Sequence, residues 1–410
     1  MADLQYFGSM QTSQGDVSLM LSIDEDASSV GKLICFGNAA FPAMGAEVDI
    51  LRSFHEWKVS IRHVYRQANQ RTYKATLTPA EQGRLMGTWA WLRPMIGGPS
   101  DGTLHLQGHW FDPLDQQHRA VSLYPASMTQ SVQAYTCQNW EDFKSWAQRV
   151  HDAGAVAFRG QASNSWRLET SLHRAGRTNL FRYRNETLQE FHSHLEATGL
   201  HIDVENPSDF ARMVALAQHH GLPTPLLDWT QSPYIAAWFA FSDVLGEKVA
   251  KRTDGGVPLP PEFVRIYALT PSFATRFTFA SMPGLDDLMP FAALAKVTPR
   301  DNPRLYAQQG RFVVTNLGNL ESYLVHLAKM GQGEMLWAAD VPKGETVKAM
   351  KDLALMGLSA ATLFPGLEGA CRTLRHQMAV QSRSAPPDVS LLPIFASAAV
   401  PVGQPGQLPV

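Results

Sequence analysis

The first third of the chain alternates apolar and polar residues with a period of two. The clearest case is Trp57, Val59 and Ile61, which alternate with Lys58, Ser60 and Arg62. A strand with one buried face produces this pattern, because successive side chains point to opposite faces of the sheet. The alternation returns at 73–77 and 103–107, and the glycine-rich run 97–102 predicts a hairpin loop. We therefore expect an antiparallel β sandwich or barrel over residues 1–130.

Apolar residues take a helical spacing from about residue 139 onward. Asn139 suits the cap of a helix whose apolar residues run from Trp140 to Val150, and Gly154 suits its end. Four more helices are expected, around 188–195, from 208 to 221, from Ser232 onward and over 347–356. Short strands are expected near 155–159, 226–227, 264–269, 312–314 and 335–338. This mixture predicts an α+β fold.

Three other segments lack either period. The polar stretch 161–184 is expected to be loop-like, and 270–304 is expected to be a long connection. The helix over 347–356 is expected to be the last. From Ser384 the chain is rich in proline and nearly free of charge, which predicts an extended tail over 384–410. The chain is thus divided into a β-rich domain (1–130), a mixed domain (131–383) and a tail.

Composition and charge exclude several classes of protein. The 410 residues carry a formal net charge of −2, so no overall positive field attracts nucleic acid or anionic lipid, and only a local basic patch remains open. The cysteines, Cys35, Cys137 and Cys371, lie far apart, which argues against a disulfide scaffold or a cysteine zinc site. No signal peptide and no membrane-spanning run is visible. We expect a cytoplasmic protein that does not attach to a membrane.

An arginine stands at the end of an expected buried strand. Arg159 follows four apolar residues and precedes Gly160 and Gln161. Its guanidinium has the planar fork that binds phosphate or ribose oxygens, and a glycine beside it lets the backbone approach a ligand. The alternative is a structural salt bridge at the end of the strand.

A second polar run, 218–233, joins a helix, a strand and another helix. Asp228 lies between Leu227 and Trp229, where burial would raise its pKa and suit it to proton transfer, or where it pairs with an arginine. Ser232 precedes Pro233 and is either a helix cap or a site residue. The other candidates have two possible roles as well. His219 is a site residue or a cap or core histidine, and Trp229 stacks on a ligand or packs in the core. The hydroxyl of Thr230 bonds a ligand or orders Gln309.

Metal chemistry has little support in the sequence. The side chains of His219 and His220 would diverge by about 100° on a helix, so they do not converge on one metal. The motifs of zinc proteases, P-loop proteins, serine hydrolases and Rossmann dinucleotide sites are absent. We therefore expect no metal.

An ordered set of motifs carries a resemblance. Its members are Phe158-Arg159-Gly160-Gln161, Trp166 with Leu172 and Arg174, the run 218–233, Phe239-Ala240, Arg304, Gln309-Gly310 with Phe312, and Leu363-Phe364-Pro365 with Leu367 and Gly369. With this set, residues 133–383 resemble the FRG domain family. The chain departs from the family at Pro225, where arginine is usual, and at Thr170, where proline is usual.

FRG domains look like relatives of ADP-ribosyltransferases. The resemblance implies a split β-sheet domain with helices and NAD as substrate, cleaved or transferred at the nicotinamide–ribose bond. It implies that Arg159, Thr230, Ser232 and Gln309 (or Gln308) form the catalytic set, joined by Asp228 from its own context. Residues expected to bind NAD are Arg159, Gly160, Gln161, His219, Trp229 and Thr230. The acceptor of any ADP-ribose would be an unidentified protein or nucleic acid.

Two other interpretations remain. In the first, the domain is a non-catalytic recognition module in which Arg159 binds a phosphate-containing ligand or a protein partner. In the second, by analogy with bacterial conflict systems, it is a toxin or phage-defence effector and the N-terminal domain is its sensor or targeting module. The sequence does not indicate an oligomeric state.

Overall fold

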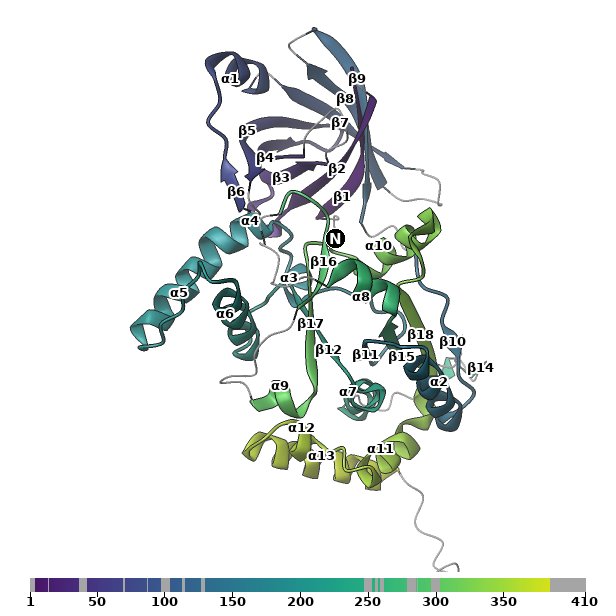
Figure 1. Cartoon of the computed structure of the whole chain (residues 1–410). Coiled ribbons are helices and arrows are strands. Elements are labelled where there is room, and N and C mark those ends of the chain that lie inside the picture. Colours follow the sequence, from purple (N-terminus) through teal and green to yellow (C-terminus); the bar gives the residue numbers. More distant parts are fainter. Residues whose placement is uncertain are drawn as a thin grey trace, which may run out of the picture.

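The computed structural model describes residues 4–13, 15–36, 43–68, 71–86, 88–96, 104–112, 115–126, 130–246, 253–254, 257–258, 262–278, 285, 287–295 and 303–383. The expected tail over 384–410 and the hairpin loop over 97–102 lie outside these ranges. Figure 1 shows an N-terminal β structure stacked on a second, larger α+β part.

The N-terminal part is a closed antiparallel barrel of eight strands, one of the two forms expected from the alternating pattern. Its sheet runs in the order β4-β3-β2-β1-β9-β8-β7-β5, and a β4–β5 pairing closes it, with β6 added at β5. The strands are β1 (Gln5–Thr12), β2 (Gly15–Ile23), β3 (Val30–Cys35), β4 (Met44–Arg52), β5 (Trp57–Ala68), β6 (Arg71–Lys74), β7 (Trp89–Ile96), β8 (Leu104–Asp112) and β9 (Gln117–Pro125).

Alternate residues of these strands fill the barrel. Val48 and Leu106 are fully buried, and Trp57 packs its ring edge on Tyr6 with ring centres 5.8 Å apart. Eight strands leave an interior just wide enough for side chains to fill. The barrel therefore has a core of its own.

The second part is built on a mixed seven-stranded sheet, β10-β18-β15-β11-β12-β17-β16, in which β10 and β18 run parallel and the other pairs antiparallel. Its strands are β10 (Tyr135–Thr136), β11 (Ala157–Gln161), β12 (Leu226–Thr230), β15 (Phe263–Leu269), β16 (Ala292–Ala295), β17 (Gly310–Thr315) and β18 (Leu336–Pro342). The fold is thus α+β, as expected. A separate short hairpin pairs β13 (Thr253–Asp254) with β14 (Val257–Pro258).

Helices cover both faces of this sheet (Figure 1). Those packed on one face share a core with β11 and β15: α2 (Trp140–Asp152), α7 (Pro233–Gly246) and α11 (Thr346–Leu355). Two further cores hold the other sheet-packed helices. One contains α5 (Leu188–Ala197) and α6 (Pro207–His219) with residues of β12, β16 and β17, and the other contains α8 (Pro271–Phe277) and α10 (Leu320–Leu327) with residues of β15, β17 and β18. The remaining helices are α1 (Pro79–Met86), α3 (Ser171–Arg174), α4 (Leu180–Arg182), α9 (Pro303–Ala307), α12 (Ala360–Leu363) and α13 (Leu367–Arg383). None of the helices in the described ranges is long and apolar enough to cross a membrane.

Three expectations about these elements were wrong. The segment 161–184 contains α3 and α4, and 270–304 contains α8, β16 and part of α9. These elements have three to seven residues, too few to establish a period, although Thr170 and Thr270 cap two of them with their side-chain oxygens. The last helix is α13, whereas α11 was expected to be the last. Helix α13 was missed because its apolar residues do not mark a buried face: Leu367 and Met378 are 81% and 69% exposed.

The barrel is fixed to the second part by a buried aspartate. Asp24 is 2% exposed, and its Oδ1 accepts hydrogen bonds from the backbone N–H groups of Thr178 and Asn179 at 2.8 and 2.9 Å. Its Oδ2 lies 3.2 Å from the Arg182 guanidinium. On the neighbouring strand β1, Gln5 donates to the Asn316 carbonyl at 2.7 Å. Each of these bonds joins a polar group of the barrel to one of the second part, so both parts would lose hydrogen-bond partners if they separated.

Helix α3, just before this contact, buries a histidine. His173 is 4% exposed, and its Nδ1 lies 2.6 Å from the Thr170 hydroxyl. Burial lowers the pKa of His173 from 6.5 to about 4, because the charged ring would lose its hydration. The folded protein therefore binds this proton less tightly than the unfolded chain does.

We predict that this histidine makes the fold sensitive to acid. Its contribution to stability is complete above pH 6.5 and is lost as the pH falls from 6.5 towards about 4. Over that interval the free energy of unfolding should fall by roughly 2–3 kcal/mol more for the parent than for His173→Gln. Urea denaturation at several pH values measures this difference. His201→Gln, at an exposed position, should keep the parent's slope, and an equal slope for His173→Gln would contradict the prediction.

Candidate functional site

The central sheet opens between strands β11 and β12. Within the described chain these strands share one register pair, Phe158 opposite Thr230, whereas β11 pairs with β15 along its whole length. Beyond that pair the two strands separate and leave a cavity of about 350 Å³. Its walls come from β11, α6, β12, α7, α9, β17 and the residue Phe364 after α12.

Gly160 sets the position of β11 on one wall. A Cβ atom at this residue would lie 1.9 Å from the backbone oxygen of Ala236 in α7, far inside contact distance. Only glycine allows the strand to lie this close to the helix. Gly160 does line the cavity, but the contact that requires a glycine is with the helix.

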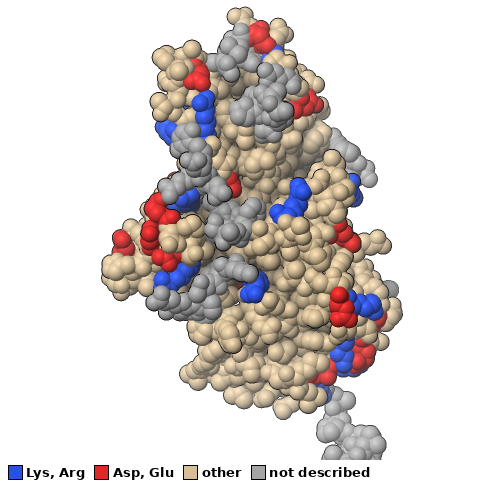
Figure 2. All heavy atoms as spheres, in the orientation of Figure 1, with Lys and Arg blue, Asp and Glu red and all other residues tan. Residues whose placement is uncertain are grey.

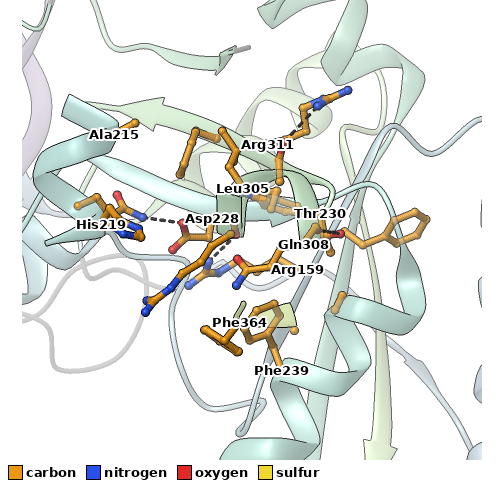
Figure 3. A pocket seen from close by; sticks show the side chains of 18 of the residues that line it. Arg159, Ala215, His219, Asp228, Thr230, Phe239, Leu305, Gln308, Arg311 and Phe364 are labelled. Carbon is orange, nitrogen blue, oxygen red and sulfur yellow. Dashed lines mark hydrogen bonds between the residues drawn. The ribbon is translucent and has the colours of Figure 1, made fainter. Parts of the chain in front are cut away.

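Arg159 reaches across the opening. Its Nη1 donates a hydrogen bond of 2.5 Å to the backbone oxygen of Asp228 on β12. Its Nε is buried and has no hydrogen-bond partner. Figure 3 shows Arg159 in the middle of the cavity, with Asp228 and Thr230 on one side and Phe239 and Phe364 on the other. Burial lowers the pKa of Arg159, the nearby Asp228 partly offsets this, and the guanidinium remains charged.

Asp228 presents a carboxylate held by a chain of hydrogen bonds. Gln218 of α6 donates its amide to Asp228 Oδ1 at 2.6 Å, and the buried Thr224 donates its hydroxyl to the Gln218 amide oxygen. The carboxylate is open to the cavity, yet the protein atoms around it raise the pKa of Asp228, and Arg159 acts in the opposite direction. A carboxylate with a raised pKa is suited to accept and release a proton.

A second hollow of about 190 Å³ adjoins the cavity behind Arg159 and Asp228. It is lined by Ser171 and Arg174 of α3 and by the segment 221–223 after α6. Arg174 is exposed, and its Nη1 donates to the Glu169 carbonyl at 2.5 Å. Arg159, Gln218 and Asp228 line both spaces, so the two hollows adjoin at these three side chains.

The outer rim of the cavity carries another arginine and an aromatic ring. Arg304 lies over the Phe364 ring at 5.4 Å from its centre and forms an ion pair with Glu368 at 2.5 Å. His219 lies near Arg304, and burial together with that positive charge lowers the pKa of His219. The charge of Arg304 at the rim is thus shared with Glu368, which acts on His219 in the opposite direction.

Comparison with known families identifies this part of the chain. Residues 154–248 match the model of the FRG domain. This chain contains an FRG domain. The match runs from Gly154, before β11, to just beyond α7, and so includes Arg159, Gln218 and Asp228. It confirms the resemblance inferred from the motifs, over the inner part of the range 133–383. No curated protein and no solved structure matches the chain.

The FRG domain brings six of the predicted site residues to the cavity: Arg159, Gly160, His219, Asp228, Trp229 and Thr230. Of these, Trp229 is 3% exposed, which leaves its ring in the core. The Thr230 hydroxyl already donates to the Gln308 carbonyl at 2.8 Å and accepts from the Ser232 N–H. Arg159 and Asp228 are the two whose charged groups are offered to a ligand.

Three predicted residues lie elsewhere. Ser232 caps α7 by accepting a hydrogen bond from the Ile235 N–H, the structural alternative weighed for it above. Gln161 is buried and donates to the Arg167 carbonyl. Gln309 is exposed, has a positive φ of 49°, and leaves the lining position to its neighbour Gln308. Gln308 donates its amide to the Leu363 carbonyl at 3.1 Å.

Some lining residues had no role assigned from the sequence. Gln218, Arg304 and Phe364 belong to the motifs that carry the resemblance, and that membership was the available signal. Among the described residues no group of three histidine, cysteine, aspartate or glutamate side chains is arranged to hold a metal.

We predict that Gly160→Ala destabilises the FRG domain. The added methyl group would have to displace the backbone of α7 at Ala236, and overpacking of this kind costs about 1–3 kcal/mol or more. Urea denaturation gives the change in the free energy of unfolding. Gly344→Ala is the matched control, since nothing lies within 4 Å of a Cβ there. Equal stability of the two variants would show that the β11–α7 contact can relax.

Proposed function

We propose that the cleft of the FRG domain binds NAD and acts on the bond between nicotinamide and ribose. The observation that supports this most is the Arg159 guanidinium, which lies in the cavity with a buried, unpaired Nε. A buried donor without a partner is costly, and an anionic ligand would supply the missing acceptor. The pyrophosphate of NAD offers such oxygens in the geometry that an arginine fork binds.

The rest of the cleft is consistent with a dinucleotide. Its volume of about 350 Å³ lies within the usual range for ligand sites, and the adjoining hollow extends it. Phe239 offers apolar surface for a flat ring, and the exposed Arg174 adds positive charge at the end formed by the adjoining hollow. The separation of β11 from β12 supports an ADP-ribosyltransferase-like split sheet as part of this proposal.

Asp228 supplies the proton transfer in this proposal. The bond between ribose C1′ and the nicotinamide nitrogen breaks, and its electron pair leaves with the ring, which becomes neutral nicotinamide. Water attacks C1′ and passes a proton to Asp228, giving ADP-ribose. A hydroxyl or amine of an acceptor protein or nucleic acid can replace the water, which would make the reaction a transfer. The neutral Gln308 amide stabilises the developing positive charge less than a carboxylate would.

A second candidate function is recognition without turnover. Three residues of the expected catalytic set are engaged elsewhere, since Thr230 and Ser232 form local hydrogen bonds and Gln309 is outside the cavity. In this case Arg159 would hold a phosphate-bearing ligand or partner. A role as a bacterial toxin or defence effector, with the barrel as sensor, is compatible with either candidate.

Nicotinamide release from NAD by the purified full-length chain tests the proposal. Arg159→Ala should lower kcat/KM about 10–100-fold, since a hydrogen bond to a charged group is worth about 1.5–3 kcal/mol. Asp228→Asn should lower kcat by about 100-fold or more while NAD binding, measured by calorimetry, is retained. Arg167→Ala, at an exposed position beside the site, should behave as the parent.

Arg159→Lys keeps a positive charge and guards against loss of folding in the alanine variant. NAD binding without nicotinamide release, lost in Arg159→Ala, would favour the recognition module. Failure of NAD to bind the parent at millimolar concentration would remove NAD from the proposal altogether.

A further inference from the structure

Three neighbouring strands of the barrel, β7, β8 and β9, present aromatic rings on their outer face, and β5 continues this face with Lys58 and Ser60. On β7 the residues Leu92 and Ala90 point to the core, so Trp89, Trp91, Arg93 and Met95 point outward. The ladder places Lys58, Trp91 and His109 in one row across β5, β7 and β8. Ser60, Trp89, Phe111 and His118 form the next row. We call this surface the aromatic face.

Contacts between the rings join these two rows into one platform. Trp89 stacks on Phe111 with ring centres 5.4 Å apart and an interplanar angle of 17°. Trp91 meets the Trp89 ring edge-on at 5.7 Å, and His118 lies 5.2 Å from Phe111. Trp91 is 37% exposed although tryptophan is usually well buried. A cluster of rings on the outside of a filled barrel contributes nothing to its core.

The charge on the aromatic face is positive. Lys58 holds its ammonium 5.4 Å from the centre of the Trp91 ring, and Arg93 is exposed one row further along β7. The outward positions of β7, β8 and β9 whose side chains are described include no aspartate or glutamate. At its borders, the carboxylates of Asp49 and Asp115 are paired with Arg62 and Arg119.

We propose that the aromatic face binds single-stranded nucleic acid. Exposed bases stack on Trp91 and on the ring cluster around Trp89, while Lys58 and Arg93 contact the phosphates. Open aromatic platforms with interspersed cations bind single strands in this way, and each stacked base is worth about 1–3 kcal/mol. A duplex keeps its bases inside the stack and offers only its phosphates. The formal net charge is −2, and Figure 2 shows acidic and basic side chains interspersed on the side drawn there, so no overall positive field adds to the attraction of this face.

The proposal is independent of the cleft and of NAD. The test uses the full chain and fluorescent dT and rU oligonucleotides of about 15 nucleotides, a length within the usual site size. We expect micromolar binding that weakens with salt, measured by fluorescence anisotropy. Trp91→Ala should weaken it about 10-fold or more, and Lys58→Glu or Arg93→Glu should weaken it and lower the salt dependence by about one released ion.

Controls separate this surface from the rest of the barrel. Phe54→Ala removes a 90% exposed aromatic ring outside the face, and Lys74→Glu reverses an exposed charge on β6, and both should bind as the parent does. Thermal melting checks that each variant folds. Absence of binding, equal affinity for duplex and single strand, or unchanged affinity in the folded Trp91→Ala and Lys58→Glu variants would each overturn the proposal. The ratio of affinities for dT and rU tells whether DNA or RNA is preferred.

Discussion

The close approach of Gly160 to the backbone of Ala236 fixes strand β11 against helix α7 at one wall of the cleft. At the same place β11 leaves its other neighbour, since β11 and β12 share one register pair and then separate. The polar backbone exposed by that separation has to be satisfied. Arg159 does this for the Asp228 carbonyl through its side chain. Within the Phe-Arg-Gly run, Gly160 thus places the strand at the edge of the opening and Arg159 supplies the group that crosses it.

In this arrangement the guanidinium of Arg159 has more N–H donors than the hydrogen bond to Asp228 uses. A guanidinium has five N–H donors, and the protein oxygen that receives one of them is neutral. The carboxylate of Asp228 has its Oδ1 bound to Gln218 instead, and Asp228 and Asp243 act on Arg159 through their charges. Arg265 differs, because it is buried and makes two hydrogen bonds to Asp340. Arg265 is therefore structural, whereas Arg159 faces the cavity.

The sequence was informative where a pattern extends over many residues or where a motif has a fixed order. Alternation over Trp57–Ile61 led to the barrel strands, and Asn139 was correctly assigned as the cap of α2. Short elements such as α3 have too few residues for a period. The choice between Gln308 and Gln309 depended on a backbone turn with positive φ, which residue type alone does not reveal at a glutamine. Whether Ser232 caps a helix or lines a site was likewise decided by three-dimensional position, because both uses suit a serine before proline.

Helix α3 lies between the contact with the barrel and the wall of the cleft. Eight residues after its cap Thr170 comes Thr178, which Asp24 of the barrel holds by its backbone together with Asn179. At the other end of the same turn, the Ser171 hydroxyl binds the N–H of Thr224 at 3.0 Å, and Thr224 in turn holds Gln218, the partner of Asp228. The anchor of the barrel and the partner of the Asp228 carboxylate are therefore connected through one helical turn. A change in how the barrel sits on residues 178–179 would act on the same turn that positions Gln218.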